Sequence, residues 1–566
     1  MKRSIFSSLV LAALAFGSCT KQLDVEPKGV LNPGQVFTPE GAEKFVIAAY
    51  SQLGNDHYDV PFSLWPYGNG RSDDQYKGGR DENDIQEFHF IQTFYNTRTD
   101  FGQVDALWYN LYVGVARAND ALNAIEPLTE AEYAQKKTRQ AEMRFLRGHF
   151  YFQLKTLFKH MPYLDEKTPK EDYPQISNVA LTDDQLWEKI ADDFTFASEN
   201  LPDKQPQVGR ADKYAAYAYL AKTRLYQAYK QDDKHAVTGI DAGKLQAVVA
   251  AADKVLTSPY RLEADFANSF LPGTFENGPE SVFAVQYSVN DNTLKGRVNF
   301  GDVLSVPQGL GCCDFNKPSQ NLVNAFRTGA DGLPLFDTYN DANVNPDADN
   351  VDPRLDHTVA IPGHAWKYEP DRPYEENWNR SPGVYSVYAS LKENVSPDAE
   401  GFVNIDPFYG NSKNRIIIRY ADVLLFKAEA LIELGRQDEA LPLINALRER
   451  AANSTGKLRT KAGQLQAHYK VEPYKPGVNV VWDREGARKA LRWERRLEFA
   501  MENSRFFDLV RWGIADQVLN AYFTKEKTRR DFLKSAQFTK GKHEYLPIPQ
   551  NQIFFSKQVY QQNTGY

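Results

Sequence analysis

The sequence predicts a mostly α-helical protein in which pairs of long helices carry long irregular insertions. Two observations support this fold class. Apolar residues recur at spacings of three and four in several long segments, which is the spacing of one helix face. This periodicity disappears between about residues 259 and 415, where Gly, Pro, Asn and Asp divide the chain into short runs. A helical scaffold over about 105–258 and 416–513 therefore flanks a loop-rich insertion.

The first residues have the layout of a bacterial secretory signal. A basic start precedes a short apolar run, and two small residues precede Cys19. The run is shorter than the roughly 20 residues that cross a bilayer. A cysteine directly after small residues resembles a lipobox, whose cysteine is lipidated; the alternative is an ordinary signal peptide with a chance cysteine. We expect a signal peptide over 1–18, a lipidated tether over 19–34 and a single domain over 35–566.

Long amphipathic segments form the expected helix pairs of the scaffold. Leu107, Leu111 and Val115 fall on one stripe of the first segment. Small residues such as Gly114 and Gly148 lie where helices would touch closely. Pairs of this length are similar to tetratricopeptide repeats, although the full consensus of that repeat is absent. The expected pairs are 105–125 with 130–158, 183–200 with 213–229, and 420–434 with 437–452.

Aromatic and polar residues are concentrated in two regions without helical periodicity, residues 57–79 and 259–415. Aromatic residues make up 13% of the chain, and the many rings in the insertion argue against disorder. Binding residues often lie on loops that a rigid scaffold positions, and rings offer large contact surfaces. The two regions therefore predict one loop-built ligand-binding face.

Motifs of catalysis and cofactor binding are absent from the sequence. It contains no HExxH, P-loop, GxSxG or GxGxxG pattern, and its nine histidines are dispersed. The formal net charge is −7, with Lys and Arg scattered among carboxylates, which argues against nucleic acid as a partner. Residues 341–352 have the spacing of a calcium loop, but Pro346 replaces the required glycine, so a solvated loop is favoured. We expect no catalytic residues, cofactor or metal.

Arg and Glu recur at spacings of three and four in residues 491–513. One interpretation of this segment is an anion-binding site. The favoured interpretation is a helix with local ion pairs, such as Arg495 with Glu498 and Glu502 with Arg505. Its apolar face would then attach the C-terminal part to the repeats.

Several segments, in the same order along the chain, carry a resemblance to a known family. They are the lipobox with its CTKQLDVEP leader, residues 108–122, 141–158, 418–434 and 495–513, and YLPIPQNQI at 545–553. Along nearly its whole length the chain resembles the SusD/RagB family, which are outer-membrane glycan-binding lipoproteins of Bacteroidota. The resemblance implies tetratricopeptide-like helix pairs, a loop-built ligand face, and capture of oligosaccharides at the cell surface without catalysis.

The resemblance also implies a partner, a SusC-like TonB-dependent outer-membrane transporter that imports the glycan and over which the protein acts as a lid. The shared segments are scaffold helices, so they do not identify the ligand. Two other functions stay open. One is a member of the same family that delivers oligopeptides, and the other is a helical-repeat adaptor that binds only protein.

Cys312 and Cys313 are adjacent in a chain that has only three cysteines. A surface lipoprotein matures in an oxidising compartment, where neighbouring cysteines can form a disulfide. So small a ring contributes only about 1 kcal/mol in the chain-entropy account, so stability does not explain it. On a loop flexed by Gly309 and Gly311, the disulfide would instead expose a small, rigid, polarizable apolar surface. The alternative is two incidental cysteines remote from the site.

Sugars pack their C–H faces on apolar surfaces. Broad pyranose faces suit Trp and Tyr, whereas a smaller, puckered furanose suits a compact disulfide. This leads to the hypothesis that the ligand is a fructan such as levan or inulin. A neutral sugar also needs hydrogen bonds from Asp, Asn or Arg to paired hydroxyls. The predicted glycan-binding residues are Trp65, Tyr67, Asp73, Asp74, Tyr95, Cys312, Cys313, Trp366, Trp378, Arg380 and Tyr409.

Overall fold

The computed structural model of the chain describes residues 33–292 and 297–566. The predicted signal peptide, the lipidation site Cys19 and nearly all of the predicted tether lie outside the described residues. None of the described helices is both long enough and apolar enough to cross a membrane.

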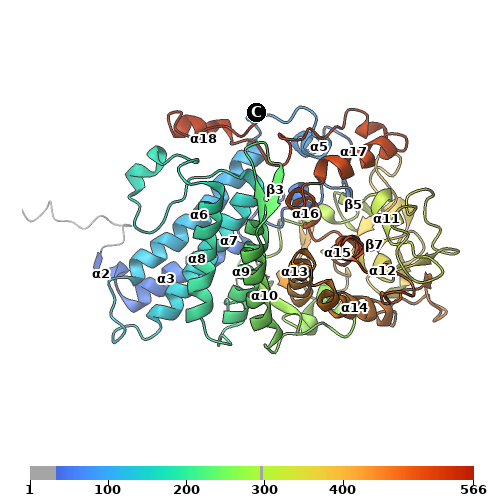
Figure 1. Cartoon of the computed structure of the whole chain (residues 1–566), viewed down its shortest axis with the longest axis horizontal. Helices are drawn as coiled ribbons and strands as arrows, with labels where there is room; N and C mark the ends of the chain where they lie inside the picture. Colours follow the sequence, from blue (N-terminus) through green and yellow to red (C-terminus); the bar gives the residue numbers. More distant parts are fainter. Residues whose placement is uncertain (1–32, 293–296) are drawn as a thin grey trace, which may run out of the picture.

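One half of the molecule is a stack of long helices, coloured blue to green in Figure 1. Successive helices from α6 to α10 pack against one another, and α3 packs on α6. Side chains of Thr182, Asp212 and Asp241 cap the starts of α8, α9 and α10 by accepting hydrogen bonds from backbone N–H groups. The predicted mostly α-helical fold is confirmed. The helices are α3 Pro39–Ser51, α6 Gly102–Ile125, α7 Lys136–Phe158, α8 Asp183–Asn200, α9 Lys213–Ala228 and α10 Ala242–Leu256.

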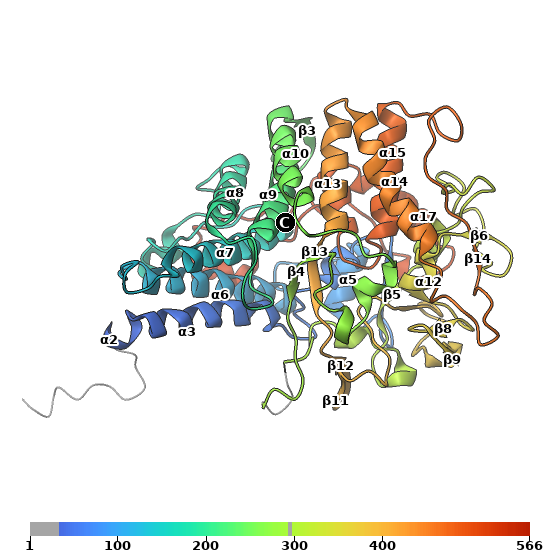
Figure 2. The same cartoon turned by 90° about the horizontal axis from the view of Figure 1, so that it is seen from below.

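A second group of helices forms the orange and red half of the molecule (Figure 2). Helix α13 packs on α14 and α15, and it also packs on α10, so it joins the two groups. The group comprises α13 Tyr420–Glu433, α14 Gln437–Asn453, α15 Arg484–Glu498, α16 Arg505–Arg511 and α17 Ala515–Glu526. Helix α18 Gln550–Phe555 lies instead on the other half, where it contacts α6 (Figure 1).

The prediction of one helix through residues 491–513 is wrong. Helix α15 ends at Glu498, and the chain turns before α16 begins at Arg505. Met501 and Asn503 adopt left-handed backbone conformations in this turn, and Asn503 N donates to Asn69 Oδ1 at 2.9 Å. The apolar spacing continues through the turn, so the pattern alone did not reveal the break.

Short strand pairs and turns fill the region between α10 and α13. Strand β4 Ser281–Val285 pairs with β13 Arg415–Arg419, and β1 Gln75–Gly78 pairs with β5 Phe315–Pro318, both antiparallel. Strands β11 Phe402–Ile405 and β12 Phe408–Asn411 form a hairpin.

The remaining elements are short. The strand pairs are β2 Tyr229–Gln231 with β3 Val237–Ile240, β6 Asn350–Val351 with β14 His468–Tyr469, β7 Val359–Ala360 with β10 Ala389–Ser390, and β8 Ala365–Trp366 with β9 Glu369–Pro373. The helices are α2 Pro33–Val36, α4 Trp65–Gly68, α5 Gln86–Thr93, α11 Gln320–Ala325 and α12 Arg354–Thr358.

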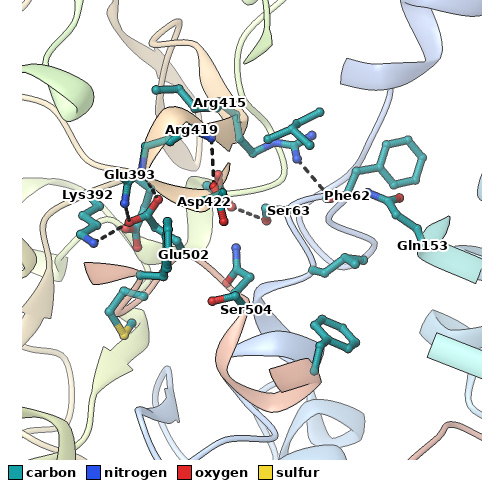
Figure 3. Close-up of a pocket in the computed structure, with 18 of the residues that line it drawn as sticks. Phe62, Ser63, Gln153, Lys392, Glu393, Arg415, Arg419, Asp422, Glu502 and Ser504 are labelled. Carbon is teal, nitrogen blue, oxygen red and sulfur yellow. Dashed lines mark hydrogen bonds and ion pairs between the residues drawn. The ribbon is translucent and has the colours of Figure 1, made fainter. Parts of the chain in front are cut away.

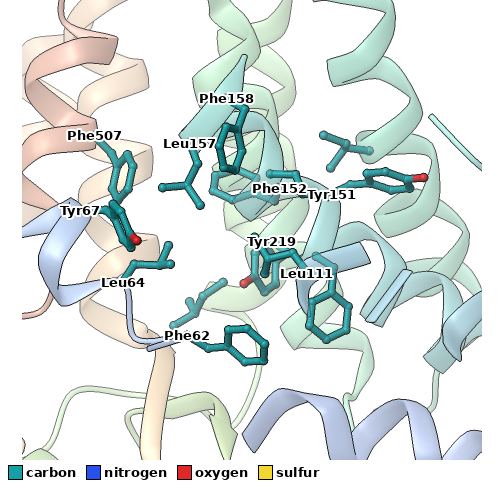
Figure 4. Close-up of a cluster of buried hydrophobic side chains, with 14 of the residues drawn as sticks. Phe62, Leu64, Tyr67, Leu111, Tyr151, Phe152, Leu157, Phe158, Tyr219 and Phe507 are labelled. Carbon is teal, nitrogen blue, oxygen red and sulfur yellow. The ribbon is translucent and has the colours of Figure 1, made fainter. Parts of the chain in front are cut away.

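Buried apolar side chains join distant parts of the sequence in one core cluster (Figure 4). Phe152 comes from α7, Tyr219 from α9 and Phe507 from α16. Glycine permits the close helix contact that the sequence predicts, because a Cβ on Gly148 would lie 2.9 Å from the Phe194 ring. Such close packing makes the helical half a rigid support for the loops.

Candidate functional site

Cys312 and Cys313 form a disulfide in the loop that follows a short 3₁₀ helix, η6 Gln308–Leu310. Cys313 is buried, whereas Cys312 is partly exposed. The backbone N–H groups of Cys313 and Asp314 both donate to Val306 O, at 3.1 and 2.9 Å, and hold the loop from inside. The structure thus contains the predicted disulfide, with Cys312 at the surface.

Trp378 and Tyr409 contact the same loop through its two glycines. A Cβ on Gly309 would lie 2.6 Å from Trp378 Cγ, and a Cβ on Gly311 would overlap the Tyr409 ring. Both rings are partly exposed. We call Cys312, Trp378 and Tyr409 the disulfide platform, because these three partly exposed residues lie in or against one loop.

Neighbouring rings hold both aromatic side chains of the disulfide platform in place. Trp378, in the 3₁₀ helix η7 Glu376–Trp378, lies on Trp366 and Tyr374, with ring centroids 5.8 and 5.4 Å apart. Tyr409 of β12 stacks on Phe402 of β11 at 5.5 Å. The rings are therefore positioned before any ligand arrives, which lowers the entropy cost of binding.

Arg380 lies beside the disulfide platform and is tied to the cysteine loop. Its backbone N donates to Asp314 Oδ2 at 2.8 Å, and its guanidinium pairs with Asp84 at 3.1 Å. Asp314 also accepts from Lys317 Nζ at 2.6 Å, and both of these side chains are buried. Burial raises the pKa of Asp314 and lowers the pKa of Lys317, while their mutual attraction offsets both shifts. Arg380, about one-third exposed at 31%, can donate hydrogen bonds to paired hydroxyls.

Three of the predicted aromatic residues are buried. Trp65, Tyr67 and Trp366 are at most 1% exposed. Trp65 packs edge-on against Phe88 at 5.2 Å, and Trp366 supports Trp378 from below. A stacking residue must offer its face to the ligand, so these three are corrected to core residues.

Asp73 and Asp74 are also buried, in ion pairs with α15 and α16. Arg496 pairs with both carboxylates, at 3.0 and 2.9 Å, and Arg505 pairs with Asp73 at 2.8 Å. Burial opposes the charge on Asp73, but the two arginines outweigh it and lower its pKa to about 2. Burial raises the pKa of Asp74. These carboxylates join the 57–79 region to the C-terminal helices, so they are corrected to structural residues.

The prediction of local ion pairs within residues 491–513 is wrong, because the charged side chains pair with other residues. Arg495 pairs with Asp508 at 2.8 Å, and Glu498 pairs with Arg419 at 2.9 Å. Glu502 also pairs with Arg419, at 2.9 Å. The spacing suits pairs within one helix, but burial brings in charged partners from other elements, and those pairs form instead.

Tyr95 remains exposed, at 54%, and packs on Phe90 at 6.5 Å. It follows the end of α5, whereas Asp84, which pairs with Arg380, comes just before the start of that helix. Of the predicted residues, the structure therefore brings together Cys312, Cys313, Trp378, Arg380 and Tyr409. It leaves the other six in the core or elsewhere on the surface.

Two residues that contact Arg380 and Tyr409, namely Asp84 and Phe402, are not among the predicted ones. The signal for Phe402 is a pair of short runs rich in aromatic and β-branched residues on both sides of the Asp406–Pro407 turn, which predicts a hairpin. Asp84 carries no comparable signal, because its role depends on a partner 296 residues away.

A polar cavity of about 180 Å³ lies between α7 and α9 on one side and β13 with the 499–507 segment on the other (Figure 3). In its wall, Arg419 and Lys392 both pair with Glu502, at 2.9 and 2.6 Å. Gln153 and Asn299 each contribute a buried side-chain oxygen without a hydrogen-bond partner in the protein. Such a cavity suits ordered water. The disulfide platform is not part of its lining.

Within residues 33–292 and 297–566, no group of three or more His, Cys, Asp or Glu side chains is placed to hold a metal ion. In the acidic loop 341–352, Asp349 pairs with Arg327 at 3.3 Å and Asp352 with Arg354 at 2.7 Å. These carboxylates are neutralised by arginines of the protein itself.

The fold and the disulfide platform together define a class, namely binding proteins in which a helical scaffold carries a loop-built ligand surface. Residues 279–566 match the model of the SusD family, and residues 69–225 match a model described as "Starch-binding associating with outer membrane". The chain belongs to the SusD family, whose members bind ligands and are not enzymes.

Full-length relatives agree with this assignment. The chain is 24% identical to SusD-like protein P2 of Formosa agariphila, over 100% of both chains. It is 25% identical to a SusD-like protein of Bacteroides ovatus, over 92% of this chain and 84% of the relative.

Solved structures share the fold. A SusD homolog from Bacteroides thetaiotaomicron superimposes with a TM-score of 0.70 at 23% identity, over 96% of this chain and 100% of the other. A laminarin-binding SusD-like protein superimposes with a TM-score of 0.65 at 22% identity, over 94% and 100%.

Proposed function

We propose that this protein captures oligosaccharides at the outer membrane of its bacterium. The observation that carries the proposal is the disulfide platform, where two partly exposed rings contact the loop that holds Cys312. Such a surface packs against the C–H face of a sugar, and the neighbouring Arg380 and Asp84 supply hydrogen bonds to hydroxyls. The names of similar proteins, which include surface glycan-binding protein A of Bacteroides thetaiotaomicron, support a glycan over a peptide.

The glycan that we propose is a fructan such as levan or inulin. Trp65, Tyr67 and Trp366 are buried and offer no face to a sugar ring, so the flat rings at the site are those of Trp378 and Tyr409, which flank the disulfide. The disulfide is compact, and a small puckered furanose can approach it closely. This supports a furanose-containing chain as the ligand of the disulfide platform.

The proposal also includes location and delivery. The N-terminal pattern supports lipidation at Cys19 and a surface-exposed anchor. The outer-membrane description of the second family model supports the same compartment. We propose that the captured glycan passes to a partner SusC-like TonB-dependent transporter, which the protein covers as a lid.

Isothermal calorimetry of residues 20–566 tests the proposal against oligosaccharides of levan, inulin, starch, laminarin, xylan and mannan, together with a peptide mixture. We expect heat of binding from a fructan. Binding to a pyranose glycan alone would keep the glycan receptor and reject the fructan. Binding to peptides alone would favour an oligopeptide-delivering member of the family. No heat of binding from any ligand tested would favour a protein-binding adaptor.

The double variant Cys312→Ala/Cys313→Ala tests the role of the disulfide. We expect the variant to lose at least tenfold in fructan affinity, which corresponds to about 1.4 kcal/mol. Unchanged affinity, or two free thiols in a titration of the folded wild-type protein, would contradict the proposed platform.

A further inference from the structure

A second group of partly exposed rings lies on the opposite face of the β11–β12 hairpin from Tyr409. His57 and Tyr58 come from the segment after α3, Phe300 from the insertion, and Phe408 from β12. The ring centroids are 4.2 Å apart for His57 and Tyr58, 5.0 Å for Tyr58 and Phe408, and 5.6 Å for Phe300 and Phe408. We call these four residues the ring cluster.

The β11–β12 hairpin links the ring cluster to the disulfide platform. Phe408 and Tyr409 are consecutive in β12, and consecutive side chains of a strand point to opposite faces. Tyr409 stacks on Phe402 of β11 on one face, and Phe408 contacts Tyr58 and Phe300 on the other. The two aromatic surfaces therefore lie back to back across a single two-stranded hairpin.

The ring cluster is only partly covered by protein. The His57 side chain is 51% exposed, and Tyr58, Phe300 and Phe408 are each partly exposed. Polar groups surround the rings. Asp59 pairs with His57, and Asn404 and Asp406 of the hairpin are exposed. Partly exposed rings with a polar rim provide the two kinds of contact that a sugar requires.

We propose that the ring cluster is a second stacking subsite, which binds a further unit of the oligosaccharide held at the disulfide platform. This inference rests on the proposed function. A chain that crosses the hairpin contacts both surfaces, whereas a disaccharide reaches only one. The protein therefore prefers oligosaccharides long enough to span the hairpin.

Calorimetry with levan- and inulin-derived oligosaccharides of two to about eight units tests this inference on wild-type protein and on Tyr58→Ala. Tyr58 lies outside the hairpin and contacts Phe408 of β12, so its replacement removes no residue of the disulfide platform. We expect wild-type affinity to rise with chain length and the variant to lose about fivefold, but only for the long chains. The matched control is Tyr109→Ala, which removes a 63% exposed ring on α6.

Two results would overturn this inference and leave the proposed function intact. Equal losses at every chain length would show that Tyr58 only supports the hairpin, and no loss at any length would show that the ring cluster does not touch the glycan. If wild-type protein bound none of these oligosaccharides but bound a pyranose glycan, the fructan would be rejected first, and the same length series with that glycan would decide the subsite. No binding of the wild-type protein to any glycan would overturn the proposed function together with this inference.

Discussion

Tyr409 lies against the bare Cα of Gly311, so its ring occupies the space that any side chain at position 311 would need. Tyr409 lies in β12 and Gly311 in the loop after η6, almost a hundred residues apart in the sequence, and Cys312 directly follows Gly311. Glycine is required here because of close approach, which lets a ring and a disulfide share one surface. The platform thus depends on the lack of a side chain at Gly311 as well as on the side chains of Tyr409 and Cys312.

Gly311→Ala should displace the Tyr409 ring and weaken glycan binding, because the added methyl group would overlap the ring. We expect a loss of about tenfold in affinity by calorimetry, with little change in thermal unfolding. Gly383→Ala is the matched control, since Gly383 is an exposed loop glycine with open space around its Cβ position. Equal affinity of the two variants would show that Tyr409 does not bind the ligand.

Reduction of the Cys312–Cys313 disulfide should lower glycan affinity and leave the helical fold intact. The ring closes between neighbours, so its contribution to folding stability is small. The measurement is a titration before and after treatment with a thiol reductant, followed by reoxidation. Affinity that returns on reoxidation supports the platform, and affinity that never changes contradicts it.

Arg380→Ala should reduce affinity by about tenfold, because it removes the guanidinium beside the platform while its backbone N–H still donates to Asp314. Arg372→Ala is the control. Arg372 lies in the same insertion and pairs with Glu369 at 2.8 Å. Similar losses in both variants would indicate a general charge effect in place of a contact with hydroxyls.

Arg354→Met should destabilise the protein strongly. The Arg354 side chain is fully buried and pairs with Asp352, Glu494 and Glu498, at 2.7, 2.6 and 3.1 Å. Its loss removes the arginine that pairs with buried Asp352 and one of the arginines that pair with Glu494 and with Glu498, which costs about 3–5 kcal/mol of unfolding free energy. Denaturant titration measures this loss, and Arg436→Ala, at an exposed pair with Glu439, should show little change. A small effect of Arg354→Met would mean that the other arginines of the network compensate.

Acid should weaken the attachment of the 57–79 region. The folded-state pKa of Asp73, about 2, lies below its ordinary value of 3.8, so the folded state binds protons less readily than the unfolded state. The stability from this group is therefore full above about pH 4 and is lost as the pH falls towards 2. Denaturant titrations between pH 5 and 2 should show a shallower fall for Asp73→Asn than for wild type. Parallel curves would assign the acid sensitivity to other groups.

The helix pairs could be predicted from the sequence because helix formation and burial of one helix face depend on neighbours three and four residues away. The bounds of α8 and α13 agree with the expected segments to within one residue. The turn at 499–504 could not be predicted, because Asn503 is held there by Asn69, far along the chain.

The helical scaffold, the family resemblance and the unusual pair of neighbouring cysteines all follow from the sequence alone. The exposure of the aromatic and acidic residues, in contrast, depends on tertiary contacts. Trp366 and Trp378 look alike in sequence, yet one is buried beneath the other. Asp73 looks like a ligand contact but neutralises Arg496 and Arg505. The exposure of a side chain and the partner of a charged group depend on contacts between segments that are far apart in the sequence. Local periodicity does not reveal those contacts.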